Sequence, residues 1–212
     1  MSTEYQRTAI LALLHRKQNQ AATQIQQVNS AINAGGDDLF LTAATGNGAT
    51  VLKTKNSDSA MELVKELSVK NNWQQPPVFA PSIEQTARKS SLWPKLGLDC
   101  TLQGCVGVSV AYCAIADTGT LVLNSSANSP ASLNFLPEHH VVLLTHGRTV
   151  MGKHDVWKLM KQEKIETPRA INLISGPSRT ADIEQTIQLG AHGPRTLTII
   201  LIDNASVVLQ IN

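Results

Sequence analysis

The chain has 212 residues, 42% of them apolar and only 16% charged, and its formal net charge is +2. This length and apolar content suffice for one domain of ordinary size. The near-neutral balance, with no cluster of Lys and Arg, argues against nucleic-acid binding and a basic membrane anchor. The apolar runs are too short for a signal peptide or the roughly 20 residues of a membrane span, so we expect a cytoplasmic protein. A low charged fraction is also typical of proteins that associate, which makes a homodimer one alternative.

The cysteines do not form a metal-binding pattern. Cys100, Cys105 and Cys113 are separated by four and seven residues, which matches neither zinc-binding nor ferredoxin spacing. An odd number also gives no complete disulfide framework. We expect the three to be small buried apolar residues and expect no metal site in this chain.

The N-terminal part is predicted to be helical and separate from the rest. Apolar residues at helical spacing predict a helix over 3–16. Residues 17–33 are rich in Gln, Asn and Ala, and form either a solvated helix or an arm. Gly35-Gly36 then interrupts any helix. We therefore expect an N-terminal helical segment, 1–34, followed by one α/β domain, 35–212.

Helices and strands alternate in the predicted domain. Residues 35–48 are predicted to be mostly loop, and a helix over 58–70 has a possible capping box in Ser59 and Glu62. A turn at 117–120 is predicted to join two runs into a hairpin. The remaining predicted elements are strands at 50–53, 78–80, 106–116, 121–123, 141–144, 171–174, 197–202 and 207–211, and helices at 156–162 and 180–189. This alternation favours an α/β sandwich around a mostly parallel sheet, which the hairpin makes mixed.

The segment ISGPSRTADIEQTIQLGAHGP, residues 174–194, predicts an anion site. A strand is expected to end at Ser175 and a helix to start near Ser178 or Thr180. Ligands gather at the carboxyl ends of strands in α/β sheets, and a helix N-terminus attracts anions. Alternatively, Ser178 or Thr180 only caps the helix and Asp182 only complements its dipole. The groups offered to a carboxylate or phosphate are those of Ser175, Gly176, Ser178, Arg179 and Thr180.

The turn within IADTGTLVL, residues 115–123, is the second candidate. Gly119 would let a backbone approach a ligand closely, and the hydroxyls of Thr118 and Thr120 could hold phosphate or water. Asp117 could accept a proton or a metal ion. The alternative is a tight hairpin in which Asp117 bonds its own turn. We expect this turn to face the 175–180 turn across a shared pocket.

Histidines supply further candidates for acid–base chemistry. Adjacent residues on a strand point to opposite faces, so His139 and His140 do not form a paired metal site. One of them could be a general acid or base, or one is exposed and the other satisfied. His192, between glycines, is either functional or a polar loop residue. The catalytic candidates are Asp117, His139, Glu184 and His192.

Four strings resemble the lactate-utilisation protein C family, also called the LUD domain. They are GVSVAYCAIADTGTLVLNSS, LPEHHVVLL, LISGPSRTADIE and LGAHGPRTLTIILI, and their order and spacing match over roughly residues 90–203. Ser109 stands where the family usually has threonine. His140 stands where the family usually has isoleucine, which makes His139 the family position.

The resemblance implies a three-layer α/β/α fold similar to ribose-5-phosphate isomerases, glucosamine-phosphate deaminases, coenzyme A transferases and 5-formyltetrahydrofolate cyclo-ligases. It also implies a role beside two iron–sulfur proteins in converting L-lactate to pyruvate. This chain lacks the family's ferredoxin-type cysteines, so it should bind no cofactor, and the clusters are expected in partner subunits. Whether the chain is itself catalytic stays open. One alternative is a stand-alone isomerase-, transferase- or cyclo-ligase-like enzyme for a phosphorylated or acyl substrate, and another is a non-catalytic interaction module.

Overall fold

The computed structural model describes residues 36–83, 104–181, 187–189 and 193–204. All of them belong to the predicted α/β domain. The predictions for the N-terminal segment, for Cys100 and for a strand at 207–211 lie outside the described residues, as do those for Asp182, Glu184 and His192. Within the described part, no helix is long and apolar enough to cross a membrane.

The centre of the domain is a five-stranded sheet in the order β1-β11-β6-β3-β2, and every neighbouring pair is parallel. Its three middle strands are almost continuous apolar runs, as expected of parallel strands buried on both faces. The strands are β1 (Thr50–Asn56), β2 (Val78–Phe79), β3 (Val106–Val110), β6 (His139–Thr145) and β11 (Thr196–Asn204).

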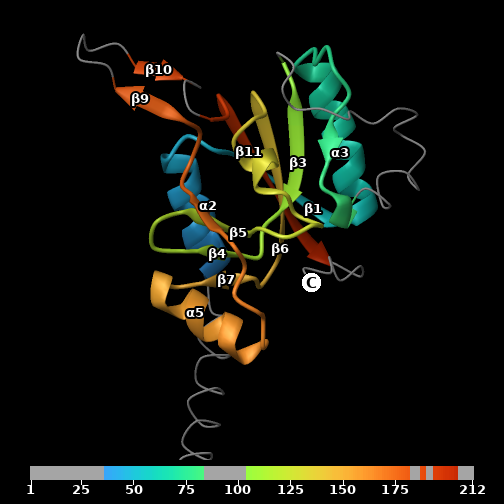
Figure 1. Cartoon of the computed structure of the whole chain (residues 1–212). Coiled ribbons are helices and arrows are strands. Elements are labelled where there is room, and N and C mark those ends of the chain that lie inside the picture. Colours follow the sequence, from blue (N-terminus) through green and yellow to red (C-terminus); the bar gives the residue numbers. More distant parts are fainter. Residues whose placement is uncertain (1–35, 84–103, 182–186, 190–192, 205–212) are drawn as a thin grey trace, which may run out of the picture. The chain divides into compact units, whose positions relative to one another are not determined.

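Both faces of this sheet are covered (Figure 1). Helix α3 (Ser57–Lys70) packs Met61 and Val64 against one face. Helix α2 (Gly36–Gly46) packs Phe40 and Ala44 toward the other. The expected α/β class and mostly parallel sheet are confirmed.

The strands of the predicted hairpin belong to a second, mixed sheet and do not join the parallel one. The predicted run 106–116 divides at Ala111-Tyr112, so only its end takes part in the hairpin. Leu121 and Leu123 pack toward the parallel sheet together with α2, and helix α5 (Lys153–Gln162) contacts β4 and β7. The order of this sheet is β7 (Thr149–Val150), β4 (Cys113–Ile115), β5 (Thr120–Asn124) and β8 (Ile171–Ile174).

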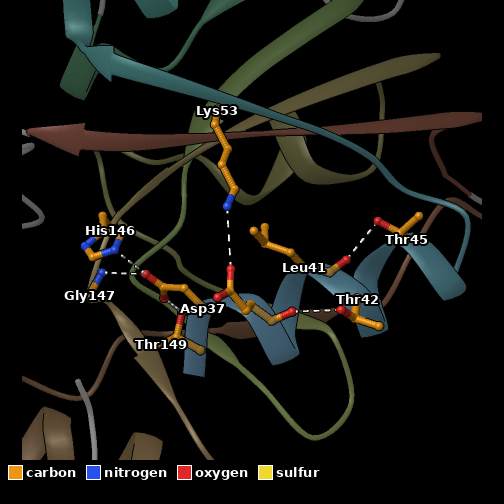
Figure 2. Close-up of polar contacts among 9 residues, drawn as sticks. Asp37, Leu41, Thr42, Thr45, Lys53, His146, Gly147 and Thr149 are labelled. Carbon is orange, nitrogen blue, oxygen red and sulfur yellow. Dashed lines mark hydrogen bonds and ion pairs between the residues drawn. The ribbon is translucent and has the colours of Figure 1, made fainter. Parts of the chain in front are cut away.

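The prediction of a loop over 35–48 is wrong, because α2 occupies most of it. Gly36 stands in the first turn, where a glycine does not interrupt a helix interior. Asp37 and Asp38 follow in that turn and complement the helix dipole. The Asp37 carboxylate accepts hydrogen bonds from the Gly147 N–H, at 2.9 Å, and from the Thr149 hydroxyl (Figure 2). These contacts fix the start of α2 to the connection between β6 and β7.

The prediction of a helix over 180–189 is also wrong. The chain there forms β9 (Arg179–Ala181) and β10 (Ile187–Leu189), which pair antiparallel, with Ala181 opposite Ile187. The intervening residues, 182–186, are not described. No helix N-terminus follows Ser178, so that part of the anion-site argument fails.

The cap of α3 lies one turn earlier than predicted. The Asn56 side chain, and not that of Ser59, is the N-cap, and it accepts a hydrogen bond from the Ser59 N–H at 2.9 Å. The capping box of Ser59 and Glu62 is therefore wrong. The buried residues Met61 and Val64 face the core as predicted.

We predict that Asn56→Ala lowers the free energy of unfolding by about 1 kcal/mol, because the Ser59 N–H loses its acceptor. Ser59→Ala is the matched control and should change it by less than about 0.5 kcal/mol. Urea denaturation of both variants measures this. An equal loss in Ser59→Ala would mean that the Ser59 hydroxyl also caps the helix.

Candidate functional site

Three segments that are distant in the sequence meet beside the amino end of β1. They are Asn47-Gly48 after α2, the β4–β5 turn, and residues 175–179 after β8. The Asn47 side chain donates a hydrogen bond to the Thr118 carbonyl at 2.8 Å. We call this meeting point the junction.

Two glycines allow the backbones of the junction to approach one another. Gly119 has φ of +60°, and a Cβ there would lie 2.4 Å from the Ala44 nitrogen. Gly176 has φ of +88°, and a Cβ there would lie 2.4 Å from the Asn47 carbonyl oxygen. Any side chain would collide with backbone and also require the left-handed conformation. Gly119 thus allows a close approach of two backbones, as expected. The partner is the backbone of α2 and not a ligand.

A chain of hydroxyl groups joins the two turns. Thr118 Oγ1 and Thr120 Oγ1 are 2.7 Å apart, and Thr120 Oγ1 and Ser175 Oγ are 2.6 Å apart. Thr120 is buried, whereas Thr118 and Ser175 are exposed. The antiparallel pairing of Leu121 with Ile174 explains the contact between Thr120 and Ser175. Thr120 precedes Leu121 and Ser175 follows Ile174, so the pairing places them opposite each other. The two turns are therefore in contact, while the shared pocket and anion binding between them stay predictions.

Arg179 brings a positive charge to the junction. Its exposed guanidinium lies over Gly48, where an added Cβ would come within 2.1 Å of Nη2. The Ser178 N–H donates to the Pro194 carbonyl at 2.8 Å, so the GPSR and HGPR strings are also in contact. The side chain of Thr180 lies outside what the structure describes, as do Asp182 and Glu184. An exposed guanidinium near two exposed hydroxyls can bind a carboxylate or phosphate.

The junction does not lie where the strand-end rule placed it. That rule concerns the carboxyl ends of parallel strands, but β8 belongs to the second sheet and the junction adjoins Thr50, the first residue of β1. Asp117 is exposed, and its carboxylate lies 3.8 Å from the Cβ position at Gly152, before α5. It therefore faces the start of α5.

The carboxyl end of β6 carries a polar cluster that the sequence reasoning missed. His146 Nε2 lies 3.4 Å from the Asp37 carboxylate, and Lys53 lies 3.5 Å from that of Asp38 (Figure 2). A carboxylate that orients an exposed histidine is one arrangement used for proton transfer. The partners are 109 residues apart in sequence (146 minus 37), so no local pattern indicates them.

His139 lies at the opposite, amino edge of the sheet. Its Nδ1 is 2.8 Å from Thr196 Oγ1, and its ring stacks on Trp73 with centroids 6.0 Å apart. Burial lowers the pKa of His139, and the charge of Glu138 partly offsets this. His139 is thus neutral near pH 7. It contacts Thr196 and Trp73 and does not take part in the hydroxyl chain of the junction.

His140 and Ser109, the two residues expected to depart from the family pattern, lie within hydrogen-bond distance of each other. His140 Nε2 is 2.7 Å from Ser109 Oγ, and both side chains are buried between β6 and β3. The other ring nitrogen of His140 is buried without a partner in the described chain. Burial lowers the pKa of His140 to about 3. The pair is a buried contact within the core, with no access for a substrate.

We predict that a side chain at Gly119 destabilises the folded protein. Gly119→Ala should lower the free energy of unfolding by about 2–5 kcal/mol, because its Cβ would meet the α2 backbone at positive φ. Gly46→Ala is the control, since no atom lies within 4 Å of its added Cβ. That variant should be as stable as the wild type or up to about 1 kcal/mol more stable. Equal stabilities of the two variants would contradict the close approach.

We predict that His140 makes the protein less stable in acid. The unfolded state takes up a proton near pH 6.5, but the folded state does so only near the pKa of about 3. Stability should therefore fall as the pH drops from 6.5 toward 3, by up to about 1.4 kcal/mol per pH unit from this group. Denaturation at several pH values should give a shallower dependence for His140→Ile. The same slope in both proteins would refute a buried neutral His140.

Comparison with known proteins agrees with the fold. The LUD domain family model matches residues 38–202, so it also includes α2, β1 and α3, beyond the strings at 90–203. The crystal structure of a DUF162 family protein from Deinococcus radiodurans is similar, with a TM-score of 0.51 and 20% identity over 80% of this chain and 97% of that one. At this identity the likeness shows the fold alone.

Curated relatives match over shorter stretches. An uncharacterized protein of Neisseria meningitidis serogroup B is 43% identical over 96 residues, 45% of this chain and 41% of its own. Lactate utilization protein C of Geobacillus kaustophilus is 32% identical over 119 residues, 52% of this chain and 49% of its own. The chain thus spans less than half the length of either relative. With the family match over most of its residues, the chain belongs to the LUD domain family.

Proposed function

We propose that this chain acts in lactate utilisation, as a subunit without clusters of its own in an iron–sulfur complex that oxidises L-lactate to pyruvate. The observation that carries the proposal is the similarity to proteins named Lactate utilization protein C. Besides the Geobacillus kaustophilus protein, that of Shouchella clausii is 32% identical over 47% of this chain. Membership of the LUD domain family supports the same role.

The proposal places the clusters in partner proteins because the cysteines of this chain lack ferredoxin-type spacing. A cluster is held by thiolates. Cys105 and Cys113 are both buried, and burial raises the pKa of the Cys113 thiol to about 12. Electrons from lactate would then pass to iron–sulfur partners.

The junction is the proposed site for the carboxylate of lactate or pyruvate. Arg179 supplies the charge, and the exposed hydroxyls of Thr118 and Ser175 supply hydrogen bonds. The Thr120 hydroxyl lies within hydrogen-bond distance of both. The arrangement requires no further charged group, because a guanidinium can bind both oxygens of a carboxylate.

We predict that deletion of the coding sequence abolishes growth on L-lactate but not on pyruvate, the product of the proposed reaction. The native host without a redundant lactate dehydrogenase is the strain for this measurement. Restoring the wild-type chain should restore growth. Unimpaired growth of the deletion strain on L-lactate would contradict the role in lactate utilisation. Oxidation of L-lactate by the purified chain alone, without iron–sulfur partners, would contradict the role as a subunit.

A further inference from the structure

A pocket of about 760 Å³ lies at the other end of the second sheet from the hydroxyl chain. One wall is formed by Asn124, the last residue of β5, and residues 125–127, and the other by residues 163–169 between α5 and β8. The β5–β8 register separates it from Thr120 by four residues, or about 14 Å of strand. The pocket is therefore distinct from the junction.

Asn124 in the wall of this pocket has an unused amide. The residue is 5% exposed, and neither its Nδ2 nor its Oδ1 has a hydrogen-bond partner among the described residues. Buried polar groups without partners are unfavourable and rare in folded proteins. The amide is therefore available to hydrogen-bond a ligand in the pocket.

Lys164 in the same wall has an unfavourable backbone conformation. It follows α5 with φ of +54°, and the next residue, Ile165, donates its N–H to the Met160 carbonyl at 3.0 Å. This is the helix end at which glycine is the usual residue, because only glycine adopts the left-handed region without strain. Because Lys164 stands where glycine is usual, a positively charged side chain lies in the pocket wall.

The free charges of the pocket are mostly positive. Lys164 and Arg169 line it, and neither takes part in an ion pair within the described chain. The Glu163 carboxylate is already bound by Arg148 and by the Tyr112 hydroxyl, at 2.7 Å. Burial opposes ionisation of Glu163, but its hydrogen bonds with Arg148 and Tyr112 leave its pKa below the usual value. Glu166 is the remaining negative lining residue.

We propose that this pocket binds an organic anion of about mononucleotide size, with its charged group at Lys164 and Arg169 and a neighbouring polar group at the Asn124 amide. Ile165, Pro168 and Ala127 supply apolar contact surface. The pocket volume falls in the range of small-molecule sites, which is about 300–1,000 Å³. It is much larger than the volume of a three-carbon acid such as lactate. This inference goes beyond the proposed function and does not depend on it.

Titration calorimetry tests the proposal with two anions of similar size, AMP for a phosphate and glutathione for a carboxylate. We expect one of them to bind the full chain, and L-lactate to bind this pocket more weakly. Lys164→Gly and Asn124→Leu should each raise the Kd for that anion at least tenfold. Both variants should nevertheless melt at the same or a higher temperature than the wild type, because each removes an unfavourable feature.

Asn72→Gly is the matched control. Asn72 follows α3 with φ of +51°, and Trp73 donates to the Ser68 carbonyl, so the helix end has the same geometry away from the pocket. This variant should also keep or raise the melting temperature, but leave the Kd unchanged. Binding of neither anion, or an unchanged Kd in both pocket variants, would overturn the proposal. A lower melting temperature of Asn124→Leu would overturn the role of Asn124 by showing that its amide is structural.

Discussion

The candidate site depends on the close approach of the Gly119 turn to the end of α2. Because glycine stands at this position, the hairpin turn lies directly against the α2 backbone. Asn47 can then bond the Thr118 carbonyl, and the β5–β8 pairing places Ser175 next to Thr120. Without that approach, the three segments of the junction would not meet.

Helix α2 is held at both ends by the second sheet. At its start, Asp37 accepts hydrogen bonds from the connection before β7. At its end, Asn47 bonds the turn between β4 and β5. The helix therefore fixes the distance between the amino edge, with the junction, and the carboxyl edge, with His146 and Asp37 (Figure 2). Between these ends, Phe40 packs into the apolar core beneath the helix.

The sequence predicted those elements whose signals are local. β6 and β11 each contain a run of four apolar residues, and α3 has apolar residues at helical spacing. The helix predicted over 180–189 failed because strand pairing between Ala181 and Ile187 is a tertiary contact that local helix signals do not reveal. The second sheet could not be predicted, because no breaker marks the change of direction at Ala111-Tyr112. The two turns were expected to face each other across a shared pocket. The structure instead brings the Thr120 and Ser175 hydroxyls into direct contact, through the pairing of β5 with β8 in the second sheet.

The central claim is that the junction binds a small carboxylate through Arg179. The most direct measurement is a calorimetric titration of L-lactate and pyruvate into the wild type, Arg179→Ala and Arg195→Ala, where Arg195 is an exposed arginine paired with Glu138. A charge-assisted hydrogen bond is typically worth ~1.5–3 kcal/mol, so Arg179→Ala should raise the Kd roughly tenfold to a hundredfold. Its melting temperature should stay near that of the wild type, and Arg195→Ala should bind normally. An unchanged Kd in Arg179→Ala, or a large fall in its melting temperature, would contradict the claim.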